Sequence, residues 1–91
     1  MKVEKTITKV YELTNLEGGY IMFYSNGLQF IHLNEVKECK VIHTIATYND
    51  KDVREYIDVI VNGLTMSFAG IKDLDLKNVS INVREEVIRH Y

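Results

Sequence analysis

The chain has 91 residues, of which 46% are hydrophobic and 26% are charged, and its formal net charge is −2. This length predicts a single domain over residues 1–91. The slightly acidic balance, with no block of like charge and no long apolar run, argues against a nucleic-acid partner and against a membrane partner. The single cysteine, Cys39, cannot form an internal disulfide, and no signal peptide is evident, so we expect a cytoplasmic protein.

The residue types favour strands over helices. The chain contains ten Val, ten Ile, six Thr and six Tyr, but only two Ala. β-Branched and aromatic side chains suit a pleated sheet, whereas Ala is the best helix former. We therefore predict a mainly β fold: an antiparallel sheet or small barrel or roll of five to seven strands, with two Asn-Gly hairpins and a short C-terminal helix.

The N-terminal segment from Val3 to Leu13 alternates between apolar and polar residues, which predicts a strand. A helix fits the same segment nearly as well, because Val3, Ile7 and Val10 also follow helical spacing. The β-propensity of these residues favours the strand. A loop follows over Asn15 to Gly19, where turn-forming residues gather.

The first predicted hairpin turns at Asn26-Gly27, a pair typical of two-residue type I′ turns. Such a turn places Phe23 opposite Phe30 and assigns the remaining residues to two faces. One face would carry Ile21, Phe23, Ser25, Leu28, Phe30 and His32. The other would carry Tyr20, Met22, Tyr24, Gln29, Ile31 and Leu33. Both faces hold large apolar side chains, and a domain of this size can cover only one of them well.

The central part of the chain predicts two long strands and a second hairpin. One strand covers Glu38 to Tyr48, a turn follows over Asn49 to Asp52, and the next strand covers Val53 to Val61. The second hairpin turns at Asn62-Gly63. A two-residue turn would pair Val61 with Leu64, Val59 with Met66, and Ile57 with Phe68, and these six residues would form one continuous apolar face.

The C-terminal segment changes its period. Asn82 with Glu85 matches a helix N-cap pattern, and an apolar stripe follows at helical spacing. The stripe consists of Val83, Val87, Ile88 and Tyr91. We therefore predict a short helix that docks by this stripe. The preceding segment from Ile71 to Ile81 indicates a loop with a short strand near Val79 and Ile81.

One group of residues could carry chemistry. Cys39 and His43 share a strand face, and His32 could lie on a neighbouring strand, so a nucleophile with its base or part of a zinc site is conceivable. No further ligand has suitable spacing, and a buried thiol beside ordinary histidines explains the pattern better. We expect no enzyme activity, no catalytic residues, no metal site and no cofactor.

The overall outline resembles pleckstrin-homology-like rolls, in which strands precede a docked C-terminal helix. The segment LQFIHLNEVKECKVI, from Leu28 to Ile42, carries this resemblance through its alternation. An Sm-like or SH3-like barrel matches the expected number of strands almost equally well. Each of these alternatives implies a small roll or barrel of β-strands, and none of them assigns the chain to a family.

The first hairpin is the predicted interface, because tyrosine and methionine are enriched at protein interfaces. The expected interface or ligand-binding residues are Tyr20, Met22, Tyr24, Ile31 and Leu33. We expect a homo-oligomer, most simply a dimer, and a non-enzymatic protein that recognises and modulates a protein partner. Its size and composition would suit an inhibitor of a host system made by a phage or mobile element. The alternative is a protein that binds or sequesters a nucleotide-like small molecule at an oligomer interface.

Overall fold

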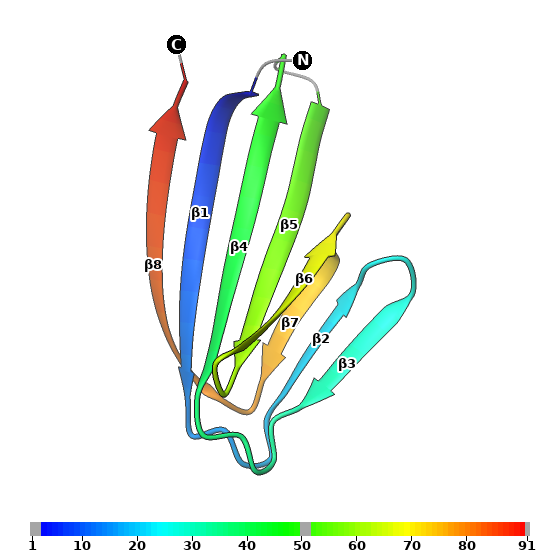
Figure 1. The fold of residues 1–91 in the computed structure, drawn as a ribbon, viewed down its shortest axis with the longest axis vertical. Coiled ribbons are helices and arrows are strands. Elements are labelled where there is room, and N and C mark those ends of the chain that lie inside the picture. Colours follow the sequence, from blue (N-terminus) through cyan, green and yellow to red (C-terminus); the bar gives the residue numbers. More distant parts are fainter. Residues whose placement is uncertain (1–2, 50–51, 91) are drawn as a thin grey trace.

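The computed structural model describes residues 3–49 and 52–90, which form eight β-strands and no helix (Figure 1). All strand pairs are antiparallel, so the predicted mainly antiparallel β architecture is confirmed. The strands are β1 (Val3–Thr14), β2 (Tyr20–Tyr24), β3 (Leu28–His32), β4 (Cys39–Tyr48), β5 (Asp52–Val61), β6 (Leu64–Ala69), β7 (Lys72–Lys77) and β8 (Ser80–Arg89).

The strands form two sheets of different length. The large sheet has the order β6-β5-β4-β1-β8, and the small sheet has the order β3-β2-β7. Within the large sheet β1 pairs with β4 on one side and with β8 on the other. Figure 1 shows the small sheet at one end of the large one, so that β8, β1, β4 and β5 extend beyond it.

The hydrophobic core lies between the two sheets. Alternation along the strands brings Val41 opposite Val59 on the inner side of the large sheet, where both are fully buried. The Phe23 ring of the small sheet meets the Phe68 ring of β6 edge to face, with centroids 4.9 Å apart. The buried cluster consists of Leu13, Leu16, Ile21, Phe23, Leu33, Cys39, Val41, Ile57, Val59 and Ile71. Burial of this cluster holds the small sheet against the large one.

The far half of the large sheet has no second layer among the described residues (Figure 1). Its inner side, defined as the side that carries Val41 and Val59, continues through the partly exposed Ile7 and Ile45. The large sheet also ends in β8, whose residues are all exposed. The molecule therefore offers open sheet surface and an open sheet edge to other molecules.

The C-terminal segment is a strand, so the predicted helix from Asn82 onward is wrong; Tyr91 lies outside the described residues. β8 pairs with β1 over its full length without a register shift, which gives its backbone hydrogen-bond partners along one side. Val83 and Val87 are four positions apart, and this spacing places them on one side of either a helix or a strand. Pairing with β1 selects the strand, and β-branched residues such as Val83 and Val87 suit a strand.

The first hairpin differs from the prediction by one residue. β2 ends at Tyr24 and β3 begins opposite it at Leu28, so a three-residue connection replaces the predicted two-residue turn at Asn26-Gly27. The Ser25 N–H donates to the Gly27 carbonyl at 2.9 Å, and the Ser25 hydroxyl donates to the Ala69 carbonyl at 2.6 Å. A shift of one residue moves the side chains of one strand to the opposite face relative to its partner.

The connection between β5 and β6 contains only Asn62 and Gly63, at φ angles of 49° and 83°, with Val61 opposite Leu64. Both positive φ angles suit these residue types. The Asn62 Oδ1 also accepts hydrogen bonds from the backbone N–H groups of residues 37 and 38, at 2.8 and 3.1 Å. This turn is therefore tied to the chain segment that leads into β4.

Two further predictions are corrected by the strand order. The segment from Ile71 to Ile81, expected to be mostly loop, contains β7, which pairs with β2, and the start of β8. The described chain therefore has eight strands where five to seven were expected, and they form two sheets without the C-terminal helix of the roll that the outline resembles. Of the predicted turn at residues 49–52, positions 50 and 51 lie outside the described residues.

Candidate functional site

The outer surface of the small sheet carries six neighbouring side chains that face away from the core. Residues on β2 and β3 alternate between the two sides, and the observed register places Met22 opposite Phe30. We call this surface the aromatic face. It consists of Tyr20, Met22 and Tyr24 on β2 and Leu28, Phe30 and His32 on β3. Phe30 is 45% exposed and Leu28 is 53% exposed, so large apolar groups here are open to contact.

The aromatic rings of this face are in contact with one another. The Tyr20 and Phe30 rings stack with centroids 4.6 Å apart and an angle of 21° between their planes. The His32 and Phe30 rings meet edge to face, with centroids 4.7 Å apart. These contacts restrict the side chains before any partner binds, which lowers the entropy lost on binding.

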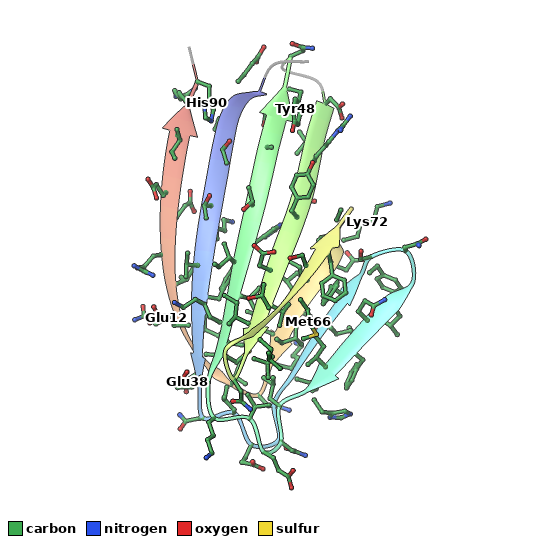
Figure 2. The ribbon with its side chains drawn as sticks, in the orientation of Figure 1. Glu12, Glu38, Tyr48, Met66, Lys72 and His90 are labelled. Atoms are coloured by element: carbon green, nitrogen blue, oxygen red, sulfur yellow. The ribbon has the colours of Figure 1, made fainter. Side chains whose placement is uncertain are left out.

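Charged residues of β7 border the aromatic face. Lys77 lies opposite Tyr20, Asp75 lies opposite Met22, and Lys72, labelled in Figure 2, lies opposite Tyr24. The Lys77 Nζ is 3.6 Å from the Asp75 Oδ1, so part of the positive charge is neutralised locally. An apolar centre with a polar border is typical of protein interfaces, whereas single-stranded nucleic acid requires a positively charged groove.

The five predicted interface residues do not share one surface. Tyr20, Met22 and Tyr24 lie on the aromatic face, but Leu33 is fully buried and Ile31 packs against the core. The prediction placed these residues together because it assumed a two-residue turn. The three-residue connection instead brings residues 28, 30 and 32 to the side of Tyr20. A sequence signal for a three-residue connection over residues 25–27 would have been needed to place residues 28, 30 and 32 on this surface.

The structure does not bring together Cys39, His43 and His32, the residues that could have formed a nucleophile with its base or part of a zinc site. Cys39 is buried at the base of the large sheet, and His43 lies four residues further along the same strand, a separation of about 13 Å. His32 belongs to the aromatic face on the other sheet. Among residues 3–49 and 52–90 no group of three or more His, Cys, Asp or Glu side chains could hold a metal ion.

His43 has a nearby carboxylate but makes no aligned hydrogen bond. Its Nε2 atom lies 3.2 Å from the Glu55 Oε1, and yet this buried nitrogen has no hydrogen-bond partner of acceptable geometry. The pair lies on the inner side of the large sheet, beyond the core, where Lys9 stands opposite His43. Proton transfer requires a well-formed hydrogen bond, and this contact does not provide one.

Cys39 should be a poor nucleophile, since burial raises the pKa of its thiol to about 11. We expect its labelling by a thiol reagent at pH 8 to be slower by about 100-fold or more than in the unfolded chain. A Thr65→Cys variant, exposed on β6, should label rapidly and serve as the control. Fast labelling of Cys39 in the native protein would mean that the two sheets separate readily.

The same raised pKa has a consequence for stability. The unfolded chain loses its thiol proton near pH 9, whereas the folded chain keeps it until about pH 11. The contribution of Cys39 to stability should therefore be complete below pH 9 and be lost between pH 9 and pH 11. Urea unfolding across this pH range should show the loss, and a Cys39→Ala variant should lack this part of it.

Two shallow hollows lie outside the aromatic face. One, of about 400 Å³, lies at the end of β6, where its pairing with β5 stops, and is lined by residues that include Tyr56, Gly70 and Lys72. The other, of about 430 Å³, lies near Glu12 and Glu38, which Figure 2 labels at the lower end of the large sheet. Neither hollow has the several tyrosines expected for the alternative small-molecule site.

Comparisons with known proteins give no family and no relative for this chain. No model of a protein family, no curated protein and no solved structure matches it. Among the described residues no helix is long and apolar enough to cross a membrane.

Proposed function

We propose that this chain is a non-enzymatic binding protein that recognises and modulates a protein partner through the aromatic face. The observation that supports this function is the cluster of exposed, mutually contacting apolar side chains on the outer side of the small sheet. Exposed apolar clusters with a polar border mark interaction sites in soluble proteins. Inhibition of a host system by a protein from a phage or mobile element is one form that such modulation could take.

The shape of the face favours a protein over a small molecule. Small-molecule sites are usually concave and enclose most of the ligand surface. A planar ligand held between two rings needs them about 7 Å apart, which is twice the usual contact distance. The Tyr20 and Phe30 rings are only 4.6 Å apart and contact each other directly. These rings therefore present one continuous surface to a partner.

The proposal can be tested with a photoreactive phenylalanine analogue at position 30, used in extracts of the source cells or of their host. The control carries the analogue at position 56, where Tyr56 is exposed on the outer side of the large sheet, opposite to the side that carries Val41 and Val59. We expect a cross-linked partner from position 30 and none of the same mass from position 56. Mass spectrometry would identify this partner for purification.

The purified partner then allows a quantitative test. A Tyr24→Glu/Phe30→Glu variant should bind it about 100-fold more weakly or worse, because central aromatic residues contribute most of the energy in protein interfaces. A Tyr56→Glu variant should bind like the parent. Circular dichroism should confirm that both variants are folded. Unchanged binding by the first variant would disprove the role of the aromatic face.

A further inference from the structure

β8 is an unusually open sheet edge. It pairs with β1 on one side only, and all ten of its residues are exposed. Four of them are apolar and between 44% and 54% exposed, namely Ile81, Val83, Val87 and Ile88. Proteins usually protect an edge by a short strand, a bulge or proline, because its free backbone groups can pair with another chain. β8 has none of these three features, but it carries four charged residues, Arg84, Glu85, Glu86 and Arg89, whose charges any pairing must balance.

We propose that β8 pairs antiparallel with the β8 strand of a second copy of this chain. The resulting dimer would have a two-fold axis perpendicular to a continuous ten-stranded sheet. The edge of β8 is distinct from the aromatic face, which lies on the other sheet, so the dimer would leave that face open. The proposal therefore stands independently of the partner proposed above.

The backbone limits how two β8 strands can meet. The His90 N–H donates to the Glu4 carbonyl at 2.9 Å, so even-numbered residues of this segment direct their backbone groups toward β1. The odd-numbered residues from Ile81 to Arg89 therefore direct theirs toward the open edge. Two copies can bond only by pairing odd residues with odd residues. This pairing keeps the inner sides of both large sheets on the same side of the dimer.

One register pairs the full strand and complements its charges. With Glu85 on the two-fold axis, Arg84 of each copy lies opposite Glu86 of the other, and Val83 lies opposite Val87. The Arg84–Glu86 pairs occupy non-hydrogen-bonded positions, where opposing side chains are closest. Five odd residues from each strand would contribute about ten main-chain hydrogen bonds in all.

The charges near the axis are also balanced. The two Glu85 side chains would meet there, but each lies opposite Lys9 of its own chain on β1. Arg84 is two-thirds exposed and has its Nη2 atom 3.4 Å from the Glu12 Oε1, so it could contact Glu12 and the Glu86 of the other copy together. Registers centred on Arg84 or on Glu86 would also place like charges opposite each other on the axis, and they would lose both Arg84–Glu86 pairs.

Charge exchange provides the main test. Sedimentation equilibrium should give the mass of a dimer for the parent. Arg84→Glu and Glu86→Arg variants should each shift the protein toward monomer by about tenfold or more in dissociation constant, since like charges would then face each other. The Arg84→Glu/Glu86→Arg double variant should recover the dimer. A monomeric parent, or a dimer that neither single change weakens, would overturn the proposal.

Cysteine cross-linking tests the register. A Glu85→Cys variant should form a disulfide-linked dimer under mild oxidation, because residue 85 lies opposite itself across the axis at about 5.5 Å between Cα atoms. A Val87→Cys variant should cross-link poorly, since the two copies of residue 87 would be about 13 Å apart. The parent is the control, because its single cysteine is buried. Preferential cross-linking through residue 87 would disprove this register.

Discussion

Replacing Phe23 with alanine should destabilise the protein by about 3–5 kcal/mol, a large share of the stability of a small domain. Phe23 is fully buried between the sheets, and its ring contacts Phe68 edge to face. The substitution removes that contact and leaves a cavity that the surrounding strands can fill only in part. Urea unfolding followed by circular dichroism should show a much lower midpoint.

The matched control is Phe30→Ala on the same hairpin. Phe30 is 45% exposed on the aromatic face, so its removal should cost less than about 1 kcal/mol. From the sequence, both phenylalanines were expected on one face of the hairpin, whereas the structure separates them onto opposite sides of the small sheet. Equal losses of stability at the two positions would contradict the observed register.

A Val59→Asp variant should fail to fold, because it places a carboxylate in the centre of the core at a cost of several kcal/mol. Val59 is fully buried and lies opposite Val41 and Met66. The described residues around it offer no cation at this depth, since the buried cluster is entirely hydrophobic. We expect an unfolded circular dichroism spectrum, or aggregation, at a temperature where the parent is folded.

The neighbouring Ile60→Asp change provides the comparison. Ile60 points to the outer side of the large sheet, is only partly buried and lies opposite Lys40. An aspartate there would face solvent and a positive charge, so the loss of stability should be about 1 kcal/mol. A folded Val59→Asp protein beside an unfolded Ile60→Asp protein would show that the two sides of the large sheet have been exchanged.

Local patterns were sufficient where the pairing partner is close along the chain. In β5 and β6 the alternation of Ile57, Val59 and Val61 combines with the two-residue connection at Asn62 and Gly63. Together they specify which residues lie opposite one another. The observed register, with Val59 opposite Met66, follows from these neighbouring residues alone.

Local patterns were insufficient where a distant strand decides the structure. The spacing of Val83 and Val87 fits a helix as well as a strand, and the capping pattern at Asn82 favoured the helix. β1, which provides the pairing partner, lies at the opposite end of the sequence. Nothing within the C-terminal segment identifies that partner, so the prediction failed for a non-local reason.

For the candidate site, too, local patterns predicted one part correctly and missed another. The alternation within β2 placed Tyr20, Met22 and Tyr24 on one side, and that grouping does not depend on the turn. The contribution of β3 depends on the register, which the three-residue connection shifts by one position. Ile31 and Leu33 were therefore expected on the surface that Phe30 occupies.

The place of β8 in the large sheet also determines how the chain can fold. The Thr6 Oγ1 lies 3.2 Å from the His90 Nε2 although these residues are 84 positions apart, so the last pairing closes a loop that contains nearly the whole chain. Such distant pairings form slowly. Until they form, β1 has one unpaired edge, which is a template for a strand from another molecule. A newly made chain is therefore most vulnerable to strand exchange and aggregation before residues 80–89 join the sheet.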